Sequence, residues 1–318
     1  MIRYFTLENK RIEPAKDTNI DKITWCDLVK PSEAELMEVS QKFKVGLDDL
    51  EDCLDESIRP RFTSDRILSN QMLVLRITTI TEIDYSKPST EPLGVIFTNE
   101  KKVITVHLSV PLYFNKLLDS LQKEQPVSEF MLLCEIIHYM IDPMEAAAQK
   151  VGAKIRELEK IVVRSDAPKA MLEPFQMNAY FIYFETAMLG NLNALKLFKH
   201  KNAVSEKDEN VLEKLDDIST DIEQVFSYAT IFRASLANIL DAYASVINNN
   251  LTTVMKVVGS LNLIIGIPTL VASVFGQNLF FGFALPDDRD PWPFIIITLL
   301  TSVVTAILYK RFRKSKWL

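Results

Sequence analysis

Two long runs without charge, close to the C-terminus, constrain the fold most strongly. No charged residue occurs between Val257 and Pro286, and a second uncharged run extends from Pro291 to Tyr309. A helix rises about 1.5 Å per residue, so roughly 20 apolar residues cross a hydrocarbon layer of about 30 Å. The sequence therefore predicts two transmembrane helices, at about 255–276 and 291–310.

The charges that flank these runs predict an orientation. Basic residues without any acid follow the second run: Lys310, Arg311, Arg313, Lys314 and Lys316. The short loop between the runs carries Asp287, Asp288, Arg289 and Asp290. Because cytoplasmic flanks are enriched in Lys and Arg, we expect both termini in the cytoplasm and the acidic loop outside. This describes a multi-pass protein of the plasma (inner) membrane, although a buried globular hairpin would also be apolar.

The chain before these runs divides into a mixed part and a helical part. Strand patterns and one helical pattern occur up to about residue 126: strands at 1–7, 22–28, 72–80, 93–99 and 102–108, and a helix at 31–43. Beyond Ser128 only helical patterns remain, and the last has no strong breaker before Pro268. We expect an α/β domain (1–126), a helical stalk region (127–253), and two membrane helices with a basic tail (254–318). The fold class is thus an α+β membrane protein, and the stalk favours oligomerisation over packing within one chain.

Composition argues against several other classes of protein. The net charge of −6 argues against a nucleic-acid partner. The three cysteines and three histidines are dispersed, without CxxC or HxxxH spacing, so a zinc cage is not expected. No P-loop, GxGxxG motif or nucleophile–base arrangement is present, so we do not expect an enzyme. A catalytic site assembled from distant residues stays open at this stage.

Small and polar residues form a stripe along one face of the last stalk helix. Steps of three and four connect them: Asp241, Ser245, Asn248, Thr252, Met255, Gly259, Asn262, Gly266, Thr269 and Ser273. Close helix–helix packing uses such residues, and so does a pore lined by one helix from each subunit. Asn262 favours the pore, because an amide in mid-membrane needs polar partners or water.

The first run ends on Gly276, Gln277 and Asn278, which are unusual residues for the end of an apolar helix. Gly and Asn commonly terminate helices, so a simple C-cap is one reading. A helix C-terminus also directs unpaired carbonyls outward, and several around an axis would form a surface of neutral oxygens. Such a surface suits Mg²⁺, which gives up its water reluctantly. The nearby Asp287, Asp288 and Asp290 would attract cations or simply be solvated.

At these residues the chain resembles the CorA family of divalent-cation channels, the two-span GxN metal-ion transporters. "TTVMKVV" enters the first span, "FGQN" closes it, "LPDD" resembles the outer loop and "RFRKSKWL" the basic tail. Farther upstream, "WCDLVKPSEAEL" and "LDDLEDCLDESIRPRF" resemble the family's Trp-x-Asp-Leu and Arg-Pro segments. The resemblance covers essentially the whole chain and implies a homopentamer with a funnel-shaped cytoplasmic domain.

The resemblance also implies roles for individual residues. Gly276 and Asn278 would form an outer selectivity ring, and Thr269, Met255 and Asp241 would face the pore. Asp52 and Asp217 match two carboxylates that share a regulatory cytosolic Mg²⁺ between neighbouring subunits.

Two residues depart from the family pattern. Gln277 replaces the family's methionine, which leaves zinc open as the transported ion. Gly266 replaces a bulky gate residue, so the constriction is expected at Met255 and Val258.

The functional expectation is therefore passive flux of divalent cations, chiefly Mg²⁺ with Co²⁺ or Ni²⁺, gated by internal Mg²⁺. The partners are other copies of the chain, divalent cations and the lipid bilayer, and no organic cofactor is expected. Two alternatives remain: a zinc transporter, which could be proton-coupled, and a membrane-anchored sensor or scaffold.

Overall fold

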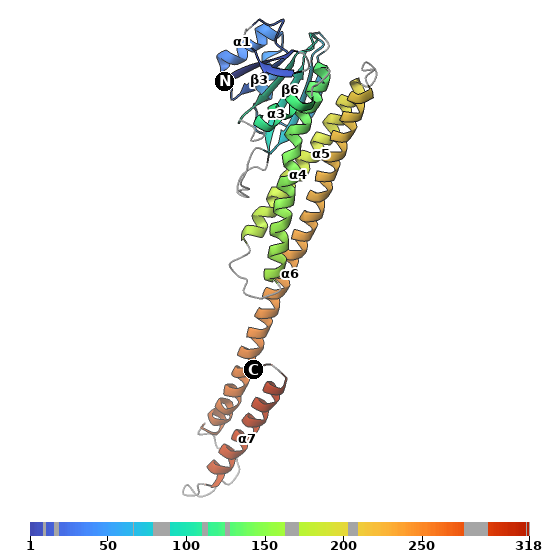
Figure 1. Ribbon diagram of the computed structural model, residues 1–318. Coiled ribbons are helices and arrows are strands. Elements are labelled where there is room, and N and C mark those ends of the chain that lie inside the picture. The colour runs from blue at the N-terminus through green and yellow to red at the C-terminus, as the bar shows by residue number, and fades with distance from the viewer. Residues whose placement is uncertain are drawn as a thin grey trace. The chain divides into compact units, whose positions relative to one another are not determined.

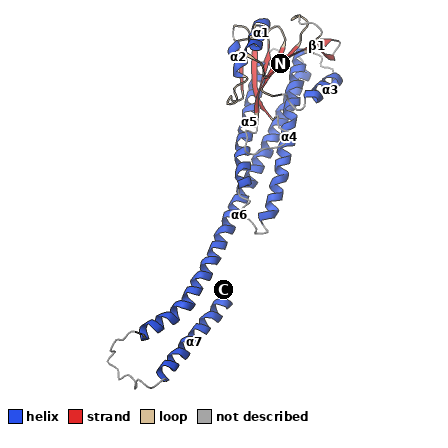
Figure 2. Cartoon of the chain, turned by 90° about the vertical axis from the view of Figure 1, so that its left-hand side faces the viewer, coloured by secondary structure: helices blue, strands red, loops and turns tan. Residues whose placement is uncertain are grey.

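In the computed structural model, residues 1–8, 11–15, 19–65, 67–78, 90–109, 114–124, 128–162, 172–202, 209–276, 292–315 and 317 are described. These residues divide into two units, Met1–Leu240 and Asp241–Leu318. The first unit contains a sheet and a helical bundle, and the second contains two apolar helices (Figures 1 and 2).

A seven-stranded sheet is the centre of the first unit. Its strands are β1 (Ile2–Glu8), β2 (Arg11–Pro14), β3 (Trp25–Val29), β4 (Arg61–Ser64), β5 (Gln71–Ile77), β6 (Glu91–Phe97) and β7 (Val103–His107). Their order is β2-β1-β3-β7-β6-β5-β4, and β3 with β7 is the parallel pair among antiparallel ones. Every residue of β3 and β7 is buried, which fits their runs of apolar and β-branched residues.

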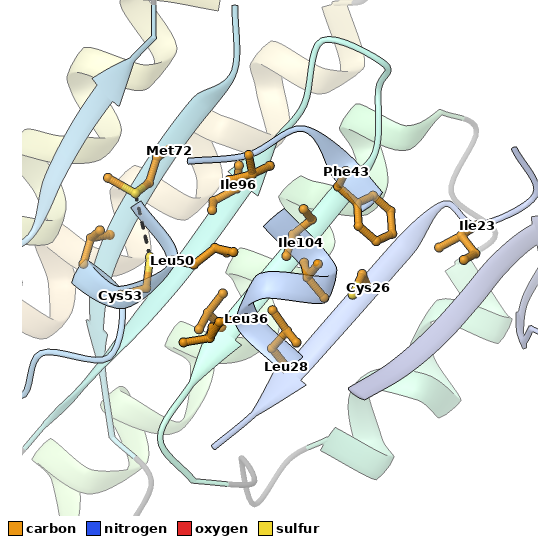
Figure 3. Close-up of a cluster of buried hydrophobic side chains, with 14 residues drawn as sticks. Ile23, Cys26, Leu28, Leu36, Phe43, Leu50, Cys53, Met72, Ile96 and Ile104 are labelled. Atoms are coloured by element: carbon orange, nitrogen blue, oxygen red, sulfur yellow. Dashed lines mark hydrogen bonds between the residues drawn. The ribbon is translucent and has the colours of Figure 1, made fainter. Parts of the chain in front are cut away.

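Two helices cover part of this sheet with a continuous apolar core. The helix α1 (Glu33–Phe43) begins at a capping box made by Ser32 and Glu35. Its Leu36, Val39 and Phe43 follow helical spacing and are buried against the sheet (Figure 3). The short helix α2 (Leu47–Asp52) adds Leu50 to the same core.

A buried charged network crosses the middle of the sheet. The fully buried Asp27 accepts hydrogen bonds from the Thr105 hydroxyl at 2.6 Å and from Arg3 Nε at 2.8 Å. The ring nitrogen Nε2 of the buried His107 lies 2.7 Å from the same carboxylate. Trp25 donates its indole N–H to Thr105 at 2.9 Å and closes the network. Burial alone would raise the pKa of Asp27, but hydrogen bonding and the charges of His107 and Arg3 hold that pKa below its usual value.

The helices α3 (Phe114–Glu124), α4 (Glu129–Val162) and α5 (Leu172–Asn202) follow the last strand. The helix α6 (Glu209–Phe275) contains 67 residues and runs alongside α4 and α5 within the first unit (Figures 1 and 2). The ion pair of Lys214 with Glu135 joins α6 to α4, and that of Lys196 with Glu223 joins it to α5.

The expected α/β fold, long helix and two C-terminal apolar helices are confirmed. The strands and helix α1 lie where the patterns predicted them, within a few residues. The prediction missed the four-residue strands β2 and β4 and the six-residue helix α2, because such short elements carry little periodicity. It also missed α3, which contains 11 residues. The helix α6 continues through Pro268, and α4 continues through Pro143.

Candidate ion pathway and regulatory carboxylates

Two helices in the second unit are apolar and long enough to cross a membrane: the last part of α6, and Phe294–Lys314 within α7 (Trp292–Lys314). Only 6% of the apolar window of α6 and 0% of that of α7 is buried within the chain. A core helix of a water-soluble protein buries its apolar surface, whereas these helices leave it exposed. The exposed apolar surface is therefore the surface that a bilayer or neighbouring subunits would cover.

One face of α6 packs against α7. Ser260 is buried, and partly buried residues lie on the same face at helical spacing: Val257, Ile264, Ile267, Pro268 and Val271. A shallow groove between the two helices is lined by Ile264 and Pro268 on α6 and by residues of α7 that include Thr301 and Thr305. This contact fixes which side of α6 faces its neighbour within the chain.

The predicted polar stripe lies on the opposite side of α6. At about 100° per residue, Asn262, Gly266 and Thr269 are half a turn away from the face formed around Ser260 and Ile264. The stripe residues are exposed except for Gly259, which is half-buried: Asp241, Ser245, Asn248, Thr252, Met255, Gly259, Asn262, Gly266, Thr269 and Ser273. Val258, the other residue predicted to line the pathway, is exposed as well. Asn262, Gly266 and Thr269 therefore point away from α7.

The two glycines of the stripe are not required by packing within the protomer. A Cβ atom built on Gly259 or Gly266 would have nothing within 4 Å. A glycine whose surroundings are open can serve a close approach from outside the chain, or an open passage.

The threonines of the stripe satisfy their hydrogens locally. The hydroxyl of Thr252 donates to the carbonyl of Asn248 at 2.8 Å, and that of Thr269 donates to the carbonyl of Ile265 at 2.8 Å. Each hydroxyl oxygen then keeps acceptor capacity for a cation or its water. Asp241 is exposed and is the single charged residue between Arg233 and Lys256, so it adds an isolated negative charge to the stripe.

The apolar part of α6 ends beside the first residue of the GQN segment. Gly276 is exposed and donates its backbone N–H to the carbonyl of Ala272 at 2.9 Å. The carbonyl of Ala272 belongs to the last turn of α6, where an α-helix generally runs out of its own N–H donors. Gln277, Asn278 and the loop acids Asp287, Asp288 and Asp290 lie outside the described residues.

Asp52, the first of the two predicted regulatory carboxylates, ends helix α2. Its carboxylate forms an ion pair with the guanidinium of Arg61, and their side chains are 50% and 41% exposed. Burial, followed by the charges of Asp65 and Asp52, raises the pKa of the neighbouring Asp49. Sequence reasoning missed Arg61 as the counter-ion, although it lies in the same quoted segment, nine residues after Asp52.

Asp217, the second regulatory carboxylate, is exposed on α6, whereas its neighbour Asp216 pairs with Lys199. Within the described part of the protomer, no three His, Cys, Asp or Glu side chains form a group that could hold a metal ion. Asp52 and Asp217 thus belong to no such three-residue group among the described residues.

Comparisons with known proteins agree over most of the chain. Residues 21–314 match the model of the family described as CorA-like Mg²⁺ transporter proteins. The cobalt/magnesium transport protein CorA of Methanocaldococcus jannaschii is 22% identical, with 93% of this chain and 92% of that protein covered. The magnesium transport protein CorA of Helicobacter pylori strain J99 is 19% identical, with 95% and 93% covered.

Solved structures show the same fold. The complete CorA magnesium transporter of Methanocaldococcus jannaschii superimposes with a TM-score of 0.82 at 20% identity, covering 100% of this chain and 99% of that one. The full-length CmaX protein gives a TM-score of 0.78 at 12% identity, covering 98% and 97%. With the family model matched across most of its length, this chain belongs to the family of CorA-like Mg²⁺ transporter proteins, which are membrane transporters of divalent cations and not enzymes.

Proposed function

We propose that this protein forms a homopentameric, funnel-shaped channel through which divalent cations, chiefly Mg²⁺, flow passively across the plasma (inner) membrane. One observation carries the proposal. The polar stripe of α6 lies opposite the face packed on α7, with open space at Gly259 and Gly266. Five such helices around an axis would place the stripes toward a common pathway. The relatives are a cobalt/magnesium transport protein and a magnesium transport protein, which supports the choice of cargo.

Self-association would also cover apolar surface that one protomer leaves exposed. Large apolar side chains are exposed along α5: Phe175, Ile182, Tyr183, Leu189 and Leu197. More are exposed on α6, including Leu251 and Val254. Contiguous exposed apolar surface marks interaction sites in soluble regions, and within the membrane it suits helix or lipid contact.

Along the proposed pathway, each part of the stripe has a chemical role. Asn278 and Gly276, with Gln277 between them, would bind the hydrated ion at the outer mouth through neutral oxygens, after Asp287, Asp288 and Asp290 concentrate it. Asn262 and Thr269 would hydrogen-bond the ion's water within the membrane. A ring of Met255 and Val258 would form a hydrophobic constriction that gates by excluding water. Both termini would be cytoplasmic, since the basic tail follows α7.

Zinc is the second candidate cargo, and Gln277 is the observation that favours it, since this position holds methionine in the family's signature. Proteoliposomes loaded with a metal-sensitive dye separate the two readings. We expect uptake of Mg²⁺ without a pH gradient, with Co²⁺ and Ni²⁺ as competitors. Uptake of Zn²⁺ alone, dependent on a pH gradient, would replace the magnesium reading with the zinc reading.

Regulation is proposed at Asp52 and Asp217, where internal Mg²⁺ would bridge neighbouring protomers and favour the closed channel. Because an ion that binds the folded assembly stabilises it, Mg²⁺ at 100 times its Kd should add about 2.7 kcal/mol. We expect the combined change Asp52→Ala and Asp217→Ala to remove this stabilisation in thermal unfolding. The same variant should be less inhibited by internal Mg²⁺.

Arg61→Gln should act in the opposite direction, because Arg61 occupies the Asp52 carboxylate in the absence of the metal. An exposed ion pair contributes up to about 1 kcal/mol, so the half-saturating Mg²⁺ concentration should fall about two- to fivefold. Lys44→Gln is the matched control, since Lys44 forms a similar exposed pair with Glu100 at 2.7 Å. An unaltered melting response in the double Asp variant would refute the regulatory site.

A further inference from the structure

The segment 53–60 connects Asp52 at the end of α2 to Arg61 at the start of β4. We propose that Arg76 and Asn191 are positioning residues that tie this segment to helix α5. When an ion replaces Arg61 at the Asp52 carboxylate and the segment shifts, α5 would then shift with it. The inference rests on the proposed regulation at Asp52 for its functional part. The structural part, which is the attachment of the segment to α5, rests on the hydrogen bonds of Asn191 and Arg76 and on close contacts at two glycines.

The side chain of Asn191 binds the backbone of β5 where the neighbouring strand β4 no longer pairs with it. The pairing of β4 with β5 ends at Arg61 opposite Val74, so Arg76 lies beyond the reach of β4. The side-chain amide of Asn191 accepts from the backbone N–H of Arg76 at 2.8 Å and donates to its carbonyl at 2.8 Å. Asn191 is fully buried, and unpaired backbone groups at such a position are costly. The amide therefore fixes α5 to β5 at this point.

The side chain of Arg76 extends the tie to the 53–60 segment. Its guanidinium donates from Nη1 to the carbonyls of Glu56 at 2.6 Å and Ile58 at 3.3 Å. From Nε it donates to the hydroxyl of Thr90 at 3.1 Å, which holds the guanidinium plane in place. Burial lowers the pKa of Arg76, and the nearby acids Glu91 and Glu56 oppose that shift. The Arg76 side chain thus binds two backbone carbonyls of the 53–60 segment, which has no regular secondary structure.

Close contacts to two glycines hold both ends of the same segment. A Cβ on Gly190, the residue before Asn191, would lie 2.7 Å from Cγ of Pro60. A Cβ on Gly94 of β6 would lie 2.1 Å from Sγ of Cys53. Larger residues would displace Pro60 or Cys53, so the glycines allow the segment to sit directly on α5 and β6.

From α5 the connection continues to α6. Glu185 of α5 pairs with Arg233 at 2.7 Å and accepts from the hydroxyl of Thr230 at 3.2 Å. Lys196 pairs with Glu223 at 3.0 Å. The helix α6 also carries Asp217 and continues into the apolar span. A shift of the 53–60 segment, when an ion replaces Arg61 at Asp52, would thus act on the helix that lines the pathway.

Hydrogen exchange on the full-length protein in detergent tests the structural part. In Asn191→Ala and in Arg76→Lys, backbone amides of residues 53–62 should exchange about tenfold faster than in the unaltered protein. Asn202→Ala is the matched control, because Asn202 also joins α5 to β5 by two hydrogen bonds, here to the side-chain amide of Gln71 at 2.9 and 2.8 Å. The control should leave exchange in 53–62 unchanged. Equal exchange in all variants, or an equal increase in the control, would overturn the tie.

Flux inhibition by internal Mg²⁺ tests the functional part. In the Asn191 and Arg76 variants, the Mg²⁺ concentration for half-inhibition should rise about fivefold or more, while the uninhibited flux and the Asn202 control stay unchanged. Faster exchange with unaltered inhibition would overturn the transmission role. If the unaltered protein itself shows no inhibition by Mg²⁺, the proposed regulation fails, and the exchange measurement still decides the tie.

Discussion

Asn278→Ala should reduce divalent-cation uptake by proteoliposomes to background. In the proposed pentamer, five side-chain amide oxygens at the outer mouth bind the hydration shell of the entering ion. If each hydrogen bond contributes about 1 kcal/mol, the loss of all five corresponds to an interaction weaker by roughly several thousandfold. The substitution changes no residue of α6, which ends at Phe275, and none of α7, so the assembly should still form. The measurement is the initial rate of Mg²⁺ entry, reported by a dye inside the vesicles.

Asn250→Ala is the control for this prediction. Asn250 is also an exposed asparagine of α6, but it lies outside the polar stripe. Its replacement should leave the rate of uptake within about twofold of the unaltered protein, because exposed substitutions have small effects. Comparable uptake in the Asn278 and Asn250 variants would contradict a selectivity role for Asn278.

Asp27→Asn should strongly destabilise the first unit. The change removes the negative charge that compensates Arg3 in the sheet, where Asp27 is fully buried and Arg3 is 22% exposed. Removing one partner of a buried ion pair typically costs about 3–5 kcal/mol. The measurement is thermal unfolding of the full-length protein in detergent, followed by tryptophan fluorescence, since Trp25 belongs to the same network. Asp21→Asn, a change at an exposed acid, should leave the transition unchanged.

The destabilisation caused by Asp27→Asn should depend on pH. The pKa of Asp27 is lowered in the folded protein, so its carboxylate stabilises the fold at every pH above the unfolded-state value of about 3.9. That contribution is lost as the pH falls through the lower folded-state pKa. The stability difference between the unaltered protein and Asp27→Asn should therefore shrink as the pH falls below about pH 4. A difference that does not change down to acid unfolding would contradict the ionised network.

The membrane helices and most strands could be predicted because their signals are local. Runs of uncharged residues, alternation and helical spacing describe neighbours in sequence, and so they located α6, α7, β5 and β7 within a few residues. Pro268 shows that a single breaker does not override such a run. The helix continues through it, as helices do in membranes where the freed carbonyl finds other partners.

The contacts that tie Arg76 to α5, and those of the buried network in the sheet, join residues far apart in sequence. Asn191 binds the backbone of a residue 115 positions earlier, and His107 lies against Asp27 across 80 positions. No spacing rule encodes such pairs, because they depend on which strands and helices become neighbours. Arg61 was missed for a different reason: it is near Asp52 in the sequence, but only the turn between α2 and β4 brings the two side chains together.

Potential-driven uptake into proteoliposomes tests the central claim most directly. With the pH equal on both sides and the potential set by a potassium gradient and valinomycin, Mg²⁺ entry should rise steeply as the interior becomes more negative. A divalent ion gains about 4.6 kcal/mol for each 100 mV when it crosses the whole field. Passive flux through a pore predicts this dependence in the unaltered protein and its loss in Asn278→Ala. Absence of uptake of Mg²⁺, Co²⁺, Ni²⁺ and Zn²⁺ at every potential, or uptake only with a pH gradient, would contradict the channel.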